Sequence, residues 1–198
     1  MKAQRYQYQF VAGNLSLDFV NTVAYRFQPE KFEDHLQNDE DLRRWAHLAR
    51  LPDLHAINLS PRMSRKMVRR IREVREQLFA VFHAIARGAP ISADALSRIE
   101  KSLRHCSAKR SLAAHGTEVR WTWHPEAGSS DFLLYPVLTA AVDLLISASI
   151  SLVHQCADEE CGWLFLDRSH AHKRRWCRMA DCGNRNKARE HYRRQNRR

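Results

Sequence analysis

Cys156-Ala-Asp-Glu-Glu-Cys161 is followed, fifteen residues later, by Cys177-Arg-Met-Ala-Asp-Cys182. The two cysteine pairs have the same internal spacing, and the segment between them is long enough to fold back on itself. Four cysteines in this pattern can place four thiolates at the corners of a tetrahedron around one Zn²⁺ ion. We therefore expect a small metal-bound module at this end of the chain.

The ligand set predicts a structural ion. Four thiolates fill every position of a tetrahedral site, so no position is left for a water nucleophile. The expected ligands of one structural Zn²⁺ are Cys156, Cys161, Cys177 and Cys182, with His154, His170 and His172 as alternative donors that we favour less. The module has too few apolar side chains to build its own core, so metal and docking must hold it.

The positive charge of the chain lies largely within and behind this module. The formal net charge is +11, and residues 168–198 contribute +10 of it, with 12 Lys and Arg against two acidic residues. The other 167 residues sum to only +1. This asymmetry indicates a polyanion-binding end attached to a body with almost no net charge. Nucleic acid is the first candidate partner, and an anionic membrane surface is the second.

Residues 184–195 are expected to form a helix whose Ala188 and Tyr192 rest on the module. Arginines recur every four residues along this segment, and arginine suits both phosphate contact and readout of guanine edges in a duplex groove. A solvated basic tail without a partner is the alternative. The expected nucleic-acid-binding residues are Arg174, Arg175, Arg178, Arg185, Lys187, Arg189, Arg193 and Arg194.

The rest of the chain has the apolar periodicity of helices. We expect helices over residues 15–25, 39–50, 62–87, 92–108 and 131–153. Residues 112–124 read as a hairpin, and its Val119, Trp121 and Trp123 are expected to pack on an N-terminal strand that carries Tyr6, Tyr8 and Phe10. A base-stacking platform is the alternative role for these aromatic residues. The first half of the 62–87 helix is rich in arginine, which favours a solvated, acid-paired face over a second nucleic-acid face.

The predicted fold is therefore mainly α with a small antiparallel sheet, followed by a treble-clef-like zinc module. The expected domains are residues 1–150 and 151–198. The apolar stretch 132–153 is long enough to span a bilayer, but Asp143, Pro136 and several hydroxyl residues favour a buried helix of a soluble protein. Five cysteines without a signal peptide indicate a reducing compartment, the cytoplasm, and Cys106 is expected to be a small buried hydrophobe.

Polar side chains interrupt the otherwise apolar 15–25 helix. Asp18, Asn21 and Thr22 lie three and four residues apart, on one face. From spacing alone, these groups more often satisfy nearby backbone atoms than bind a ligand. We nevertheless consider a small-ligand pocket that involves Asn14, Asp18 and Asn21 as the hypothesis for this segment.

Two groups of residues resemble known families. The finger motif consists of Cys156, Cys161, residues 165–167, 174–177, Met179, residues 182–185, Lys187 and Ala188, and it resembles the CGNR-type zinc finger. Residues 13–22, Gly-Asn-Leu-Ser-Leu-Asp-Phe-Val-Asn-Thr, resemble the start of the ABATE domain, which accompanies that finger in bacterial proteins described as stress-induced transcription regulators. The resemblance implies a zinc-dependent DNA-binding module joined to a helical sensing domain.

The expected function is thus a zinc-dependent, DNA-binding transcription regulator, responsive to stress or to an unidentified small-molecule effector, and not an enzyme. An RNA-binding zinc protein is the alternative, because the sequence contains no groove-specific code. A metal-dependent nuclease that uses Asp167, His170 and His172 is a weaker alternative, since these residues lack a recognisable metal and general-base arrangement. The sequence carries no signal for the oligomeric state.

Overall fold

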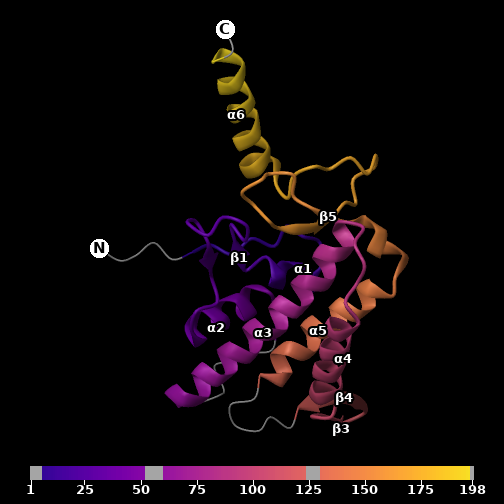
Figure 1. Cartoon of the computed structure of the whole chain (residues 1–198). Helices are drawn as coiled ribbons and strands as arrows, with labels where there is room; N and C mark the ends of the chain where they lie inside the picture. Colours follow the sequence, from indigo (N-terminus) through magenta and orange to yellow (C-terminus); the bar gives the residue numbers. More distant parts are fainter. Residues whose placement is uncertain (1–5, 52–59, 124–129, 197–198) are drawn as a thin grey trace.

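The computed structural model describes residues 6–51, 60–123 and 130–196 (Figure 1). Helices dominate the body of the molecule, and the last helix stands away from it at one end. The helices are α1 (Leu15–Val20), α2 (Asp39–Leu48), α3 (Pro61–Ala86), α4 (Ala93–Ser107), α5 (Asp131–Leu145) and α6 (Asn184–Gln195). The predicted class, mainly α with small antiparallel sheets and a C-terminal zinc module, is confirmed.

Side-chain caps begin four of the body helices, α1 to α4, at or within a residue of the predicted positions. The Asn38 side chain accepts a hydrogen bond from the Asp41 amide at 3.0 Å at the start of α2. Ser60 and Ser92 cap α3 and α4 in the same way. Each cap satisfies an amide that has no partner inside its helix, so these starts are fixed locally.

Helix α3 is the centre of the body. It contacts α1, α2 and α4, and its buried stripe follows the predicted steps of three and four residues. The buried apolar residues of α3 are Met67, Val68, Ile71, Val74, Leu78, Val81 and Phe82. Trp45 of α2 and the apolar face of α5 complete the core around this stripe.

Much of the arginine-rich half of α3 is neutralised by acids of neighbouring segments, as favoured from the sequence. Buried Arg75 donates to both carboxylate oxygens of Asp34 at 2.8 and 2.7 Å, and Arg72 contacts the same carboxylate at 2.7 Å. Arg70 pairs with Asp131 at 3.2 Å. Burial opposes ionisation of Asp34, but the Arg75 hydrogen bonds outweigh it and hold the pKa of Asp34 below its ordinary value.

Within the described residues, the strands form three separate two-stranded antiparallel sheets. They pair β1 (Val23–Ala24) with β2 (Glu33–Asp34), β3 (Arg110–His115) with β4 (Glu118–Trp123), and β5 (Val153–Gln155) with β6 (Leu164–Leu166). The expected N-terminal strand is wrong, because the described residues 6–11 form no strand. Tyr6 stacks on His35 and Phe10 on Trp45, so these aromatic rings cover the segment around α2 and not the hairpin.

Two helices end earlier than predicted. Helix α1 stops at Val20, and α5 stops at Leu145, after which a 3-10 turn (Ala148–Leu152) leads into β5. The chain enters β1 shortly after α1, and it passes through the 3-10 turn into β5 after α5; a helical pattern in the sequence does not reveal these changes. Within the described ranges, no helix is long and apolar enough to cross a membrane.

A single hydrophobic core runs from the body into the cysteine module. Strand β6 is buried, its Leu166 amide donates to the Ala12 carbonyl at 2.9 Å, and the Trp163 ring N–H donates to the Val23 carbonyl at 3.0 Å. The division into domains 1–150 and 151–198 stays a prediction, since packing is continuous across it.

Candidate metal centre and nucleic-acid interface

Two structural units bring the four cysteines together. Cys156 directly follows β5 and Cys161 lies three residues before β6, so the first pair occupies the turn of a hairpin. Cys177 and Cys182 flank the start of a short π-turn (Met179–Gly183) that leads into α6. This order, a cysteine turn in a hairpin and then a cysteine pair at a helix start, is the one expected of a treble-clef-like module.

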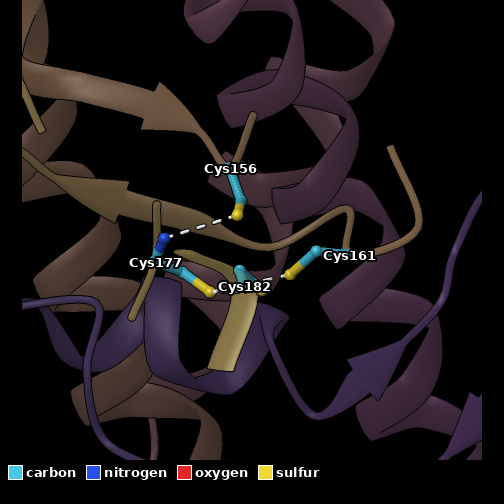
Figure 2. A group of neighbouring side chains, drawn as sticks. All are labelled: Cys156, Cys161, Cys177 and Cys182. Carbon is cyan, nitrogen blue, oxygen red and sulfur yellow. Dashed lines mark hydrogen bonds between the residues drawn. The ribbon is translucent and has the colours of Figure 1, made fainter. Parts of the chain in front are cut away.

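The sulfur atoms are arranged as zinc ligands would be. Figure 2 shows the four side chains converging on one point, and all four sulfurs lie within 4.8 Å of one another. The Cys161 and Cys177 sulfurs are 3.6 Å apart, and the Cys177 and Cys182 sulfurs are 3.5 Å apart. A Zn–S bond of about 2.3 Å in a tetrahedron requires S–S distances of roughly 3.8 Å, close to those found. The site fits one structural Zn²⁺ bound by the four predicted cysteines.

Two glycines lie at close contacts in this arrangement. Gly162, in the hairpin turn, has a φ of +74°, and a Cβ there would lie 3.2 Å from the Cβ of Arg26. Gly183, between Cys182 and α6, has an ordinary φ, but a Cβ there would meet the Met179 sulfur at 2.4 Å. A larger residue at position 183 would require the Met179 side chain to move, so this glycine of the finger motif lets Met179 pack closely on the π-turn.

Asn21 joins the body to the finger. Its side-chain amide donates to the Leu164 carbonyl at 2.8 Å, and its side-chain oxygen accepts from the Leu164 amide at 2.9 Å. All these groups are buried, so each would be costly to leave without a partner. The pair of bonds fixes β6, and with it the hairpin that carries Cys161, against the end of α1.

A buried carboxylate fixes the start of α6. The Asp158 side chain is fully buried and accepts from Arg185 Nε at 2.6 Å and from Arg189 Nη1 at 2.9 Å. Burial raises the pKa of Asp158, but the two arginine bonds outweigh this and hold the pKa below its ordinary value. Arg189 also pairs with Glu160 at 2.8 Å. Because Asp158 lies between the first two cysteines, it ties α6 to the metal turn.

Arg185 also contacts the metal site itself. Its Nη2 lies 3.3 Å from the Cys182 sulfur, and the Cys177 amide donates to the Cys156 sulfur at 3.4 Å. Donors of this kind offset the negative charge that four thiolates leave on a zinc complex.

Arg174 holds the loop between the cysteine pairs. Its guanidinium donates to the Trp176, Cys177 and Val11 carbonyls and lies 4.3 Å from the centre of the Phe165 ring. The same loop is closed by buried Asp167, which accepts from the Ser169 amide and hydroxyl and from the Arg174 amide. These hydrogen bonds, with that from the Ser169 hydroxyl the largest contribution, lower the pKa of Asp167 to about 2.

The eight predicted nucleic-acid-binding residues thus fall into two groups. Arg174, Arg185 and Arg189 make the internal contacts described above and are only partly exposed. The exposed group consists of Arg175, Arg178, Lys187, Arg193 and Arg194. Within this group, Arg178 pairs with Asp181 and Arg194 pairs with Glu190 at the surface. Arg168 and Lys173, which the prediction omitted, are exposed beside them. Nucleic-acid contact by any of these residues stays a prediction.

The three residues of the hypothetical ligand pocket bond to nearby groups. Asn14 caps α1 by accepting from the Ser16 amide at 2.8 Å and donates to the Ala140 carbonyl at 3.3 Å. Asp18 accepts from the Ala12 amide at 2.9 Å, and Asn21 binds Leu164. Burial raises the pKa of Asp18 to about 6. A ligand at these residues stays a prediction.

The geometry gives no support to the nuclease alternative. The Asp167 carboxylate is buried and is bonded to its own loop, while His170 is exposed. Over residues 6–51, 60–123 and 130–196, the four cysteines are the sole cluster of potential metal ligands.

The sequence did not predict the role of Asp158 or the two hydrogen bonds of Asn21 to Leu164, which we call the Asn21 clamp. Asp158 had a signal, since it is an acid between two metal ligands followed by an arginine-rich helix, but the charge alone does not say which arginines it binds. The partner of Asn21 lies 143 positions away, so no local pattern identifies it.

Two segments of the chain match models of known protein families. Residues 13–148 match the ABATE family, described as "Putative stress-induced transcription regulator", and residues 153–195 match the CGNR zinc finger. No curated protein matches the chain. The first match spans more than half of the chain, and the second contains all four cysteines of the metal site. The chain therefore belongs to the ABATE family and ends in a CGNR zinc finger.

Proposed function

We propose that this protein is a zinc-dependent DNA-binding transcription regulator that acts in the cytoplasm of a bacterium. The observation that carries the proposal is the combination of a +10 segment with a helix that is anchored at its base and exposed along its length. None of the described residues of α6 is buried, and Figure 1 shows the helix standing away from the body. A basic element that is fixed in direction and otherwise free of packing is suited to enter a groove.

The two faces of α6 have different roles. Arg185 and Arg189 are four residues apart and face Asp158. Lys187 and Arg194 are seven residues apart and lie on the opposite side of the helix. Internal ion pairs thus orient α6, while the outward side presents cations to a partner.

The dimensions of α6 agree with groove binding. Twelve residues at about 1.5 Å per residue give a helix of roughly 18 Å, and the major groove of B-DNA admits an α-helix. The exposed Arg168, Lys173 and Arg175 lie in the loop before Cys177, where they are available for phosphate contacts that position the helix.

A salt titration of duplex binding tests the proposal. We expect log K to fall with log salt concentration with a slope of about −4 to −6, since each neutralised phosphate contributes about −0.9. Lys187→Gln is expected to reduce the magnitude of that slope by about 0.9, while Arg98→Gln, which removes an exposed arginine on α4, is the matched control and leaves it unchanged. A protein that binds duplex no better than its Lys187→Gln and Arg194→Gln double variant would contradict the role given to α6.

The role of zinc and the kind of nucleic acid are separate arms of the same experiment. Removal of zinc by a chelator should abolish binding, because the four cysteines hold the base of α6. Competition between the duplex and a structured RNA of equal length then decides between DNA and the RNA-binding alternative. Preference for the RNA would replace DNA as the partner while retaining the basic helix as the contact.

The effector of the body remains a prediction. A cavity of about 720 Å³ lies between α3 and residues 32–38, and its lining includes Arg65, Arg69 and Arg72. This cavity is separate from Asn14, Asp18 and Asn21. Native mass spectrometry of freshly purified protein tests for a bound effector, and Asp18→Ala against Arg65→Gln shows at which of the two places it binds.

A further inference from the structure

The metal site is open to a cavity on one side. A cavity of about 240 Å³ lies between the finger and the N-terminal part of the body, far larger than the roughly 30 Å³ that a water molecule occupies. Three of the cysteines, Cys161, Cys177 and Cys182, line it on the finger side, and Ala24, Tyr25 and Glu33 are among the body residues that line it. Cys156 lies outside the lining.

The hydrogen bonds to sulfur divide the four cysteines differently. Cys156 accepts from the Cys177 amide, and Cys182 accepts from Arg185. Within the part of the chain that the structure describes, the Cys161 and Cys177 sulfurs receive no N–H donor. A hydrogen bond to a thiolate lowers the electron density available for attack, so Cys161 and Cys177 are the more nucleophilic pair.

The exposed fraction differs between Cys161 and Cys177. Cys161 is 7% exposed, whereas Cys177 is 2% exposed. Cys161 is therefore the most exposed of the four ligands, its sulfur accepts no N–H hydrogen bond from the described residues, and it lines the cavity.

We propose that Cys161 is a site of oxidation by a small neutral peroxide that enters this cavity. Glu33, Asp181 and Arg185 line the cavity, and Arg185 is paired with buried Asp158, so the lining has no excess of positive charge. Four thiolates on one Zn²⁺ add net negative charge, so a neutral oxidant is favoured over an anionic one. The proposal names one stress to which a regulator of this family would respond, and the modification itself does not require that the protein bind DNA.

The chemistry requires only the peroxide. The Cys161 thiolate attacks one peroxide oxygen, an S–O bond forms as the O–O bond breaks, and the released hydroxide and a proton leave as water, so the sulfur becomes a sulfenic acid. The Cys177 thiolate, whose sulfur lies 3.6 Å away, then attacks that sulfur; a disulfide forms and hydroxide leaves. These two cysteines can then no longer serve as thiolate ligands, and the base of α6 loses its support.

The test treats the zinc-loaded full chain with hydrogen peroxide. Zinc release is followed with a coloured chelator, and the remaining thiols are trapped and located by peptide mass spectrometry. We expect Cys161 to be the first thiol lost, a Cys161–Cys177 disulfide to follow, and Cys156 to be modified last. Equal loss of all four thiols, or loss of Cys156 first, would overturn the proposal.

Two variants test whether the cavity is the route of entry. Ala24→Phe fills the cavity from β1 and should slow zinc release about tenfold, since access limits thiolate reactivity, whereas Ala24→Ser should leave the rate unchanged. Zinc content and circular dichroism before treatment show that Ala24→Phe is folded; if it is not, a bulky hydroperoxide on the unaltered protein supplies the same test and should react far more slowly than hydrogen peroxide. Equal rates in these comparisons would contradict entry through the cavity.

Cys106 provides the remaining control. It is buried, donates to Asp131 at 3.5 Å, and burial raises its pKa to about 12, so it is protonated and unreactive. Cys106→Ser should leave the rate of zinc release unchanged. Failure of duplex binding in the salt titration would leave these thiol measurements intact, so the two proposals fail separately.

Discussion

The body and the finger of this protein are stabilised in different ways. The body surrounds the apolar stripe of α3 with other helices, and its main buried charge pair, Arg75 with Asp34, supports a core that hydrophobic burial already defines. The finger has a short apolar strand, four cysteines and one buried carboxylate. The comparison teaches that the direction of α6 depends on a metal and a few polar contacts, whereas the body depends on many apolar ones.

Loss of the metal should produce the largest difference in stability between the finger and the body. Cys177→Ser is expected to abolish stoichiometric zinc and the order of α6, a loss of several kcal/mol, because binding free energy of a structural zinc is folding free energy. The body helices α2 to α5 should remain. Zinc analysis together with amide hydrogen exchange checks this, and simultaneous loss of protection in α3 would show that the body also depends on the metal.

Loss of the Asn21 contacts between the body and the finger should destabilise the protein nearly as much. Asn21→Ala removes both bonds to Leu164 and leaves a buried N–H and C=O without partners, so we expect a loss of about 3 kcal/mol in the free energy of unfolding. Asn184→Ala, which removes an exposed side-chain bond to the Ala180 carbonyl, is the matched control and should cost less than about 1 kcal/mol. Equal effects of the two variants in chemical denaturation would argue against the clamp.

Loss of the Asp158 carboxylate inside the finger should have a smaller effect on stability. Asp158→Asn leaves Arg185 and Arg189 without a charged partner, and about 2 kcal/mol of stability should be lost, since both guanidiniums remain about a third exposed and partly hydrated. Asp181→Asn removes an exposed pair with Arg178 and should change stability by less than about 0.5 kcal/mol. A weakened duplex affinity in the first variant alone would show that Asp158 orients α6.

Asp18 offers a test confined to the body. Its pKa rises from 3.8 to about 6 through burial, so the protonated carboxyl stabilises the fold at low pH and this contribution is lost as the pH rises through 6. The unaltered protein should therefore lose up to about 2 kcal/mol relative to Asp18→Asn between pH 4 and pH 7. Thermal unfolding of both proteins across this range measures the difference, and a constant difference would contradict a raised pKa.

The sequence by itself determined the elements whose causes are local. The spacing of Cys156, Cys161, Cys177 and Cys182 identified the metal site, and the side chains of Asn38 and Ser92 fixed helix starts. Helical periodicity predicted α3, and helix-forming residues predicted α6. These features depend on residues a few positions apart or on a set of four thiolates that suits a tetrahedral Zn²⁺ ion. The charge count likewise located the basic end without any structure.

The tertiary structure alone decided the roles of residues whose partners are distant in the chain. It assigned Arg174, Arg185 and Arg189 to internal contacts, placed Asn21 against Leu164, and put Tyr6 on His35 and not on the hairpin. An arginine has the same local signal whether its guanidinium meets a buried carboxylate or a phosphate, because the choice depends on which acid the fold brings within reach. The tertiary structure likewise decides which cysteines line a cavity, because body residues such as Ala24 and Glu33 form its other wall.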